Sequence, residues 1–494
     1  MNYLIKLFPE INLKSASLKR RYIAALQLNL HTILSNIDPE VKILLEWDRL
    51  IVQTSPNADL PALVDAMQRI PGIQKFFAAN FLETFDPTMI LDVVRRAYGQ
   101  QLHNKTFAVH VKRTGTHAFT SLELARYIGG ALRDEFPTRG VDLENPEIAI
   151  RLEINSKNAV VLETEYAGLG GFPIGTQEEV LSLISGGFDS AVASMQLMRR
   201  GCKVHFLFFN LGGRQHAVGV QQMATQLWQR YSASHRVRFI EVDFSQVLTN
   251  ILERIPVGNQ GVVLKRSMLR AADRIAQTWD IPAIVTGEAL GQVSSQTLTN
   301  LNAIDRASET VVLRPLISWD KPDIIDMARR IDVAELAASI PEFCAAISSN
   351  PNARVKLSQV EFDETRLDRN LLQHAIETAR NADIKDIQQA LVDAPAFTSI
   401  GCVNNAKTQA TNLQSNDVII DVRPPAQNHV LNSAFRKHRD LNITQIPYYH
   451  IANEFSKLDQ SKNYYLYCDK GVMSAMQVEH LRAQGYRNVQ VWQQ

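Results

Sequence analysis

LSLISGGFDS, residues 181–190, is the stretch of this sequence that decides its fold. The apolar residues at its start predict a buried strand, and apolar side chains then recur at helical spacing from Ala191 to Met198. The join is therefore a strand, a loop and the start of a helix. Such a join directs unpaired backbone N–H groups and the positive end of the helix dipole at one point, and Gly186 and Gly187 let an anion approach the backbone closely. The stretch predicts a phosphate-binding loop.

The kind of phosphate-binding loop follows from a comparison of motifs. The sequence contains neither the GxxxxGK[ST] run of a P-loop nor the GxGxxG run of a dinucleotide site. The six residues SGGFDS instead resemble the loop of the PP-loop ATP pyrophosphatases, which hold ATP and release pyrophosphate when they adenylate a substrate. That resemblance implies that Asp189 helps to organise metal and pyrophosphate, and that Ser185 and Ser190 contact phosphate. A tight Gly-Gly turn between two core elements is the alternative interpretation.

Length and composition restrict the classes of protein to which this chain can belong. At 494 residues the chain is too long for one hydrophobic core and predicts three or four domains. No apolar run reaches the ~18 residues of a membrane span, and the opening MNYLIKLFPEINLKS is too charged for a secretory signal, so we expect a cytoplasmic protein without a membrane partner. The net charge of +1 means that any RNA site must be a local patch. The four cysteines form no CxxC pair, so we assign no protein-held metal site.

The first part of the chain predicts two small α/β units. Residues 1–75 combine two helical patterns with two apolar strand patterns. From Thr106 the pattern changes to an alternating strand, a polar glycine turn and an amphipathic helix that starts near Ser121. Residues 76–167 thereby resemble the THUMP domain, an RNA-binding α/β module, and residues 1–75 resemble the ferredoxin-like unit that precedes it.

Four side chains on or beside the polar turn of the THUMP-like region are candidates for RNA contact. They are Lys112, Arg113, His117 and Phe119. The cations could neutralise phosphate, and an aromatic ring could stack on a base. Solvated side chains at a turn are the alternative, and the resemblance favours RNA contact.

Residues 176–400 alternate strand and helix patterns, which predicts a doubly wound parallel sheet with helices on both faces. In such a sheet the ligand binds at the carboxyl ends of the strands, so the loops after residues 204–209 and 283–286 belong at the ATP rim. The polar segment 286–302 is expected to hold adenine and the RNA end. With the PP-loop resemblance, the residues expected to contact ATP are Leu183, Ile184, Ser185, Gly186, Gly187, Asp189, Ser190, Phe208, Phe209, Lys265, Gly287 and Gln296.

The segment DKPD, residues 320–323, predicts a helix start. Asp320 is expected to cap the helix, Pro322 suits its first turn, and Asp323 is favourable to the helix dipole. Capping accounts for the aspartates but not for Lys321. An exposed lysine is one interpretation of Lys321, and neutralisation of a transferring phosphate is the other.

Residues 417–494 follow a linker-like segment and predict a further unit. The apolar runs VIIDV and YYLY and residues 489–492 predict strands, and the loop CDKGVMS leads from the second strand into a helix that ends at Gly485. This unit resembles a rhodanese domain, with Asp421 and Arg423 in the entry strand and Cys468 at the start of the loop. Loop N–H groups and the helix N-terminus can stabilise a thiolate or a persulfide on Cys468. A packed core cysteine is the alternative.

The rhodanese-like loop departs from its family at one place. Ser474 stands where rhodaneses commonly carry an arginine or a similar residue, and Ala475 follows it. Lys470 is then the nearest cation to Cys468 in the sequence.

The sequence indicates a functional role for only one of the other three cysteines. Cys202 opens a core strand and is expected to be packed, and Cys402 borders the linker without an interpretable role. Cys344 lies in IPEFCAAIS, far from Cys468 in the sequence. In a reducing cytosol a disulfide between Cys344 and Cys468 would be transient and catalytic.

The ordered set of units closely resembles the four-domain form of the tRNA 4-thiouridine synthetase family, the tRNA sulfurtransferases, over essentially the full length. The resemblance implies that a cysteine desulfurase loads Cys468 as a persulfide and that ATP with Mg²⁺ adenylates uridine 8 of tRNA, with Lys321 a candidate for stabilising the phosphate charge. The persulfide then delivers sulfur, and Cys344 attacks to leave a Cys344–Cys468 disulfide, which a reductant resets. The resemblance implies no permanently bound cofactor. It adds the sulfur carrier protein of thiamine thiazole synthesis as a second acceptor.

Two other functions compete with this interpretation. Another PP-loop enzyme, either an amide-forming ligase or a thiolase with a CxxC iron–sulfur site, is disfavoured by the absence of CxxC and by the rhodanese-like tail. A non-catalytic RNA-binding protein with a degenerate nucleotide fold is disfavoured by the intact SGGFDS and by Cys468. The sequence leaves open whether the chain forms a homodimer.

Overall fold

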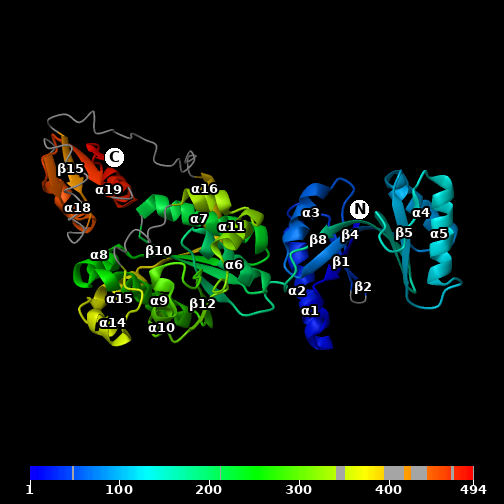
Figure 1. The fold of residues 1–494 in the computed structure, drawn as a ribbon, viewed down its shortest axis with the longest axis horizontal. Helices are drawn as coiled ribbons and strands as arrows, with labels where there is room; N and C mark the ends of the chain where they lie inside the picture. Colours follow the sequence, from blue (N-terminus) through cyan, green and yellow to red (C-terminus); the bar gives the residue numbers. More distant parts are fainter. Residues whose placement is uncertain are drawn as a thin grey trace. The chain divides into compact units, whose positions relative to one another are not determined.

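The computed structural model describes residues 1–46, 49–211, 213–340, 351–393, 417–423, 442–468 and 472–492. The chain divides into two units (Figure 1). The first comprises residues 1–177 with residues 198–201 and 230–235, and the second comprises the remainder. Each unit is described by itself.

The first unit is built on one eight-stranded sheet with the order β2-β3-β1-β4-β8-β7-β5-β6. Its strands are β1 (Asn2–Leu7), β2 (Lys42–Glu46), β3 (Arg49–Gln53), β4 (Ile73–Leu82), β5 (Thr106–Arg113), β6 (Gly140–Val141), β7 (Ile148–Ile154) and β8 (Ala159–Ala167). The antiparallel pairing of β4 with β8 joins the ferredoxin-like and THUMP-like regions into one sheet. The boundary predicted at residues 75 and 76 lies inside β4, and the domain limits stay a prediction.

Helices cover this sheet with the amphipathic faces that the sequence patterns indicate. Their bounds are α1 (Pro9–Asn12), α2 (Ala16–Leu34), α3 (Leu60–Arg69), α4 (Pro87–Tyr98), η1 (Gly99–Leu102) and α5 (Ser121–Glu135). The start of α5 is defined by a capping box, because the Thr120 hydroxyl accepts from the Glu123 N–H while the Glu123 carboxylate accepts from the Thr120 N–H. The α5 helix therefore begins at the residue predicted for it.

The second unit contains a six-stranded sheet with the order β13-β12-β9-β10-β11-β14. Its strands are β9 (Val180–Leu183), β10 (Val204–Asn210), β11 (Arg238–Asp243), β12 (Ala283–Val285), β13 (Val311–Leu313) and β14 (Arg380–Asp383). The first five are parallel, which confirms the predicted doubly wound α/β class. The edge strand β14 runs antiparallel to β11 and was not among the predicted strands.

Helices lie on both faces of this sheet (Figure 1). Neighbouring residues of β10 point to opposite faces, since the ring of Phe208 contacts His216 of α7 while the ring of Phe209 contacts Phe244 before α8. The helices are α6 (Phe188–Arg199), α7 (Gly213–Tyr231), α8 (Ser245–Arg254), η2 (Val257–Asn259), α9 (Gln260–Thr278), η3 (Ser294–Gln296), α10 (Leu298–Asp305), α11 (Lys321–Arg330), α12 (Ala334–Ser339), α14 (Leu357–Glu364), α15 (Arg369–Glu377) and α16 (Ile384–Asp393).

The rhodanese-like region forms a separate parallel sheet with the order β16-β15-β17-β18. Its elements are β15 (Asp417–Asp421), β16 (Asn442–Gln445), α18 (Tyr448–Glu454), η6 (Phe455–Lys457), β17 (Asn463–Tyr467), α19 (Val472–Ala483) and β18 (Val489–Val491). Three of these strands match the predicted ones, and β16 was not predicted.

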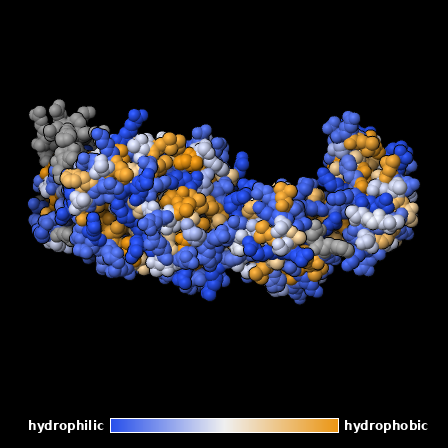
Figure 2. All heavy atoms as spheres, turned by 90° about the horizontal axis from the view of Figure 1, so that it is seen from below, coloured by the Kyte–Doolittle hydropathy of each residue, from blue (hydrophilic) through white to orange (hydrophobic). Residues whose placement is uncertain are grey.

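The face of the molecule seen in Figure 2 is mainly hydrophilic, with apolar residues gathered in separate patches. Among the residues described, no helix combines the length and the apolar character needed to cross a membrane.

Candidate active site

The SGGFDS loop joins β9 to α6 and is closed by its own serines. The buried Ser190 hydroxyl donates to the Gly187 carbonyl at 3.1 Å and accepts from the Ser185 N–H at 3.2 Å. The two serine hydroxyl oxygens lie 3.2 Å apart. These contacts fix the turn before the first turn of α6, where backbone N–H groups are free to meet an anion.

Two glycines make the close packing of this loop possible. Gly186 has a φ of +83°, which favours glycine, and a Cβ there would lie 2.9 Å from the Ile340 side chain. A Cβ on Gly287 would lie 2.6 Å from the Asp189 carbonyl carbon and from the Ser190 nitrogen. The backbone after β12 therefore lies directly against the SGGFDS loop, and the site is assembled from both segments.

Asp189 is held by two side chains from distant parts of the sequence. Its Oδ1 accepts from Lys321 Nζ at 2.7 Å, and its Oδ2 accepts from Gln292 Nε2 at 2.9 Å. The Lys321 ammonium also lies 5.7 Å from the centre of the Phe188 ring. The structure thus brings Lys321, at the start of α11, to the SGGFDS loop, whereas Gln292 was not a predicted site residue.

The predicted capping of α11 is wrong in one respect. Asp320 occupies the N-cap position, but its side chain makes no capping hydrogen bond. An N-cap side chain accepts from the N–H of the second or third helical residue. Pro322, the second residue here, has no N–H, so only the Asp323 N–H could serve, and it makes no such bond.

Lys265 of α9 is paired with a buried carboxylate beside Gly287. Its Nζ lies 2.8 Å from Glu288 Oε1, and Arg314 Nε lies 2.9 Å from Glu288 Oε2. Burial opposes ionisation of Glu288, but the charges of Lys265 and Arg314 outweigh burial and lower its pKa. The pairing of Glu288 with Arg314 was not predicted. The position of Glu288, directly after a buried strand and a glycine, is the sequence signal that could have indicated it.

The remaining residues predicted to contact ATP differ in how far their side chains are buried. Leu183 is half-buried and Ile184 is buried, whereas Phe208 and Phe209 belong to the core of β10. Gln296 is buried at the end of η3. The two phenylalanine rings pack against other protein rings, so these residues can offer a ligand only their backbone.

His216 of α7 was also missed by the sequence analysis. Its Nε2 lies 3.3 Å from the Ser185 carbonyl oxygen. Burial lowers the pKa of His216 to about 4, so the imidazole is neutral at pH 7 and donates from Nε2 to the loop.

A second candidate centre surrounds Cys468 at the end of β17. The thiol is buried, and its sulfur lies 3.3 Å from the Ser474 N–H nitrogen and 3.4 Å from the Ser474 hydroxyl oxygen. Ser474 lies in the first turn of α19, so its N–H, which has no partner within the helix, donates to the sulfur instead. Ser474, noted above as a departure from rhodaneses, is therefore in contact with Cys468.

A buried ion pair supports the strand beside Cys468. Arg423 Nε and Nη2 each lie 3.0 Å from a carboxylate oxygen of Asp421, and the Arg423 guanidinium lies 5.1 Å from the centre of the Tyr467 ring. The Val422 N–H donates to the Tyr467 carbonyl at 3.0 Å. Cys344, Cys402 and Lys470 lie outside the described residues, so the proposed Cys344–Cys468 pairing stays a prediction, while Cys202 is buried as expected.

Four known domain families match this chain in the order of the regions described above. The ThiI ferredoxin-like domain matches residues 2–76, the THUMP domain residues 88–162, the family described as "Thiamine biosynthesis protein (ThiI)" residues 175–368, and the rhodanese-like domain residues 405–493. The "tRNA sulfurtransferase" of Proteus mirabilis is 44% identical over 492 residues, covering 100% of this chain and 99% of the relative. The chain belongs to the tRNA sulfurtransferase family.

Further matches agree with membership of the tRNA sulfurtransferase family. The "tRNA sulfurtransferase" of Aeromonas hydrophila is also 44% identical and is covered completely. A crystal structure of a 4-thiouridine synthetase–RNA complex with bound ATP superposes with a TM-score of 0.70 at 25% identity, covering 77% of this chain and 99% of that one. The predicted resemblance and the predicted fold class are confirmed.

The four predicted RNA residues lie on or beside the β5–α5 loop of the first unit. Lys112 is exposed. His117 donates from Nε2 to the Thr114 carbonyl at 3.1 Å and stacks on Phe119 with ring centres 6.0 Å apart. Phe119 also packs against the core beneath it. The loop therefore holds these rings against each other, and their contact with RNA stays a prediction.

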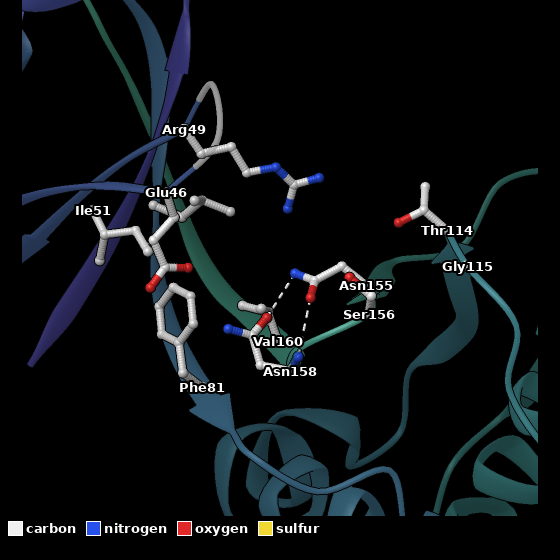
Figure 3. Close-up of a pocket in the computed structure, with 11 residues that line it drawn as sticks. Glu46, Arg49, Ile51, Phe81, Thr114, Gly115, Asn155, Ser156, Asn158 and Val160 are labelled. Atoms are coloured by element: carbon white, nitrogen blue, oxygen red, sulfur yellow. Dashed lines mark hydrogen bonds between the residues drawn. The ribbon is translucent and has the colours of Figure 1, made fainter.

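A cavity of about 300 Å³ opens beside this loop, within the first unit. Figure 3 shows the Arg49 side chain extending toward Thr114 and Asn155, with Phe81 on the opposite wall. The buried carboxylate of Glu153 pairs with Arg49 and with Lys6, each at 2.7 Å. This cavity was not predicted from the sequence, because its lining comes from five separate segments of the chain.

Proposed function

We propose that this chain transfers sulfur to uridine 8 of tRNA in an ATP-dependent reaction that gives 4-thiouridine. The observation that carries the proposal is the assembly of the SGGFDS loop with Asp189, Lys321 and Gly287 at the carboxyl edge of the six-stranded sheet. Membership of the tRNA sulfurtransferase family supports the same conclusion. ATP and tRNA are the substrates.

The first step is adenylation of the uridine. The glycine backbone of the loop and the N-terminus of α6 suit the phosphates of ATP, because a side chain at Gly287 would fill the space that the loop needs. The uridine O4 attacks the α-phosphate, so an O–P bond forms, the bond to pyrophosphate breaks, and pyrophosphate leaves. Lys321 stabilises the charge that develops on phosphate.

Magnesium fits the same site through the carboxylate of Asp189. When bound with ATP, Mg²⁺ neutralises charge on the departing pyrophosphate. Hydrogen bonds from Lys321 and Gln292 hold this carboxylate in one orientation within the SGGFDS loop.

The second step uses the two cysteines. A cysteine desulfurase supplies the outer sulfur of a persulfide on Cys468, which the Ser474 N–H and the first turn of α19 stabilise as an anion. That sulfur attacks C4 of the adenylated uridine, and AMP leaves. The Cys344 thiolate then attacks Cys468 Sγ, releasing 4-thiouridine and forming a Cys344–Cys468 disulfide. A dithiol reductant returns both cysteines to thiols.

A second acceptor is proposed for the same persulfide. The family that matches residues 175–368 is described as a thiamine biosynthesis protein. We therefore propose that Cys468 also donates sulfur to the carrier protein of thiamine thiazole synthesis. This branch needs the rhodanese-like region but not the SGGFDS loop.

The test is thiolation of a tRNA transcript with ATP, magnesium, a cysteine desulfurase, cysteine and a reductant. Wild type is compared with Cys468→Ala and with Cys344→Ala. Loss of thiolation in both variants, with tRNA-dependent pyrophosphate release retained, supports the divided mechanism. Full thiolation by Cys468→Ala means that sulfur arrives by another route, and the proposal fails.

A further inference from the structure

A pocket of about 310 Å³ lies at the opposite end of the six-stranded sheet from the SGGFDS loop. Parallel strands β10 and β11 begin there, whereas their carboxyl ends face the ATP site. Its lining is Lys203, His205, Arg236, Val237, Arg238 and Asp383. None of these residues has a part in the proposed reaction.

The pocket lining carries three cations and one carboxylate. Arg236 Nε pairs with Asp383 at 3.1 Å, but the Arg236 side chain is 79% exposed. Lys203 Nζ pairs with Glu179 at 2.7 Å, and that carboxylate is 47% exposed. Ion pairs this exposed contribute only about 0–1 kcal/mol, so a more highly charged anion can displace their carboxylates at little cost.

Arg238 differs from the other two cations because it makes no ion pair in the described part of the chain. Its guanidinium lies 4.9 Å from the centre of the Trp279 ring. Stacking of one guanidinium face on an indole holds the group flat and leaves its N–H edge available for a bidentate contact. Phosphate oxygens match that edge in geometry and charge.

His205 lines the pocket and connects two of its neighbouring segments through hydrogen bonds. Its Nδ1 accepts from the Arg238 N–H at 3.0 Å, and its Nε2 lies 2.8 Å from Glu179. An imidazole that accepts at Nδ1 is neutral, and burial lowers the pKa of His205 accordingly. The ring therefore positions Arg238 without adding a charge to the lining.

We propose that this pocket binds a phosphate group through Arg236, Arg238 and Lys203. Two sources share this chemistry, namely a phosphodiester of the tRNA backbone and a free phosphorylated small molecule. The exposure of Arg236 favours the RNA backbone, because a shallow site can receive a chain that continues on both sides. The RNA source rests on the proposed function, whereas the small-molecule source does not.

The first measurement is the salt dependence of tRNA binding by the full-length protein. The double variant Arg236→Gln/Arg238→Gln is compared with wild type and with Arg369→Gln, which removes an exposed cation of α15 outside the pocket. Each phosphate contact adds about 0.7–0.9 to the slope of log K against log salt. We expect the slope of the double variant to fall by about one and that of Arg369→Gln to stay unchanged.

The second measurement is calorimetric titration of the same proteins with inorganic phosphate, after thermal unfolding has established that all are folded. A lower salt slope in the double variant supports the phosphodiester source. An unchanged slope with phosphate binding lost in the double variant supports the small-molecule source. If neither the slope nor phosphate binding differs from wild type, the pocket is not a phosphate site. Failure of wild type to bind tRNA would contradict the proposed function, and the phosphate titration would still test the pocket.

Discussion

Replacement of Gly287 by alanine tests the assembly of the ATP site most sharply. A Cβ at this position would lie 2.6 Å from the Asp189 carbonyl carbon and from the Ser190 nitrogen. Both are backbone atoms of the SGGFDS loop, which cannot rotate away as a flexible side chain can. The backbone after β12 and the loop must therefore separate.

The size of the effect follows from that distance. Carbon atoms in contact prefer a separation of about 3.5 Å or more, so the two segments must move apart by roughly 1 Å. Inserting a methyl group into a packed region costs about 1–3 kcal/mol of stability. A misplacement of about 1 Å at a reacting centre costs about 100-fold in rate. We expect Gly287→Ala to lose about 100-fold in tRNA-dependent pyrophosphate release while remaining folded.

The assay compares pyrophosphate release and thermal unfolding for Gly287→Ala and for Gly130→Ala. Gly130 lies within α5, and a Cβ there meets nothing within 4 Å. Alanine within a helix stabilises by about 0.5–1 kcal/mol relative to glycine, so the control should unfold at the same or a higher temperature and keep full activity. Wild-type pyrophosphate release by Gly287→Ala would refute the packing argument.

Three further predictions concern the two centres. Lys321→Met removes the cation 2.7 Å from Asp189. Because Lys321 is partly exposed, the free energy of unfolding should change by less than about 0.5 kcal/mol. Pyrophosphate release should fall about 100- to 1,000-fold, because the charge on the reacting phosphate loses its stabilising cation. Ser474→Ala removes the hydroxyl 3.4 Å from the Cys468 sulfur but keeps the backbone N–H, so trapping of the persulfide should show roughly 3- to 10-fold slower loading. His216 has a pKa of about 4 in the folded state and 6.5 in the unfolded state, so between these pH values the folded protein binds fewer protons. Wild type should therefore lose about 3 kcal/mol of stability as the pH falls from 6.5 to 4. Chemical denaturation should show a smaller loss of stability for His216→Gln.

Each of these predictions has an outcome that contradicts it. Unchanged pyrophosphate release by Lys321→Met would remove Lys321 from the adenylation step. Persulfide loading of Ser474→Ala at the wild-type rate, with Ala475→Ser as the matched control in the same turn, would show that the hydroxyl does not support the sulfur. Parallel pH profiles for wild type and His216→Gln would mean that His216 is not the group whose protonation destabilises the fold.

The sequence predicted those parts of the fold whose patterns are local. The strand, loop and helix around residues 181–190 were predicted correctly because apolar spacing and a six-residue motif both lie within one stretch. The β4 strand was missed because it is buried on both faces, with Phe76 in one core and Phe77 in another, and so shows no alternation. The edge strands β14 and β16 were missed because their RNAD and NITQ sequences are polar, as exposed edges allow.

The candidate site was predicted as a set of residues but not as a set of contacts. Asp189 and Lys321 were each proposed from local motifs, whereas their 2.7 Å contact depends on how the chain folds between two residues 132 positions apart. Ser474 was noted only as a departure from the common rhodanese residue. Its contact with Cys468 was not predicted, because the backbone N–H that makes it is supplied by any residue. The lysine and arginine around Glu288 converge from α9 and from the segment after β13, and no spacing along the chain indicates that.

The most direct test of the central claim is nucleoside mass spectrometry of two tRNA transcripts that differ only at position 8, one with uridine and one with cytidine. Each is incubated with the full-length protein, ATP, magnesium, a cysteine desulfurase, cysteine and a reductant, while pyrophosphate release is followed. We predict 4-thiouridine and tRNA-dependent pyrophosphate release with the uridine transcript, and neither with the cytidine transcript. Thiolation of the uridine transcript without ATP, or equal pyrophosphate release with both transcripts, would contradict ATP-dependent activation of uridine 8.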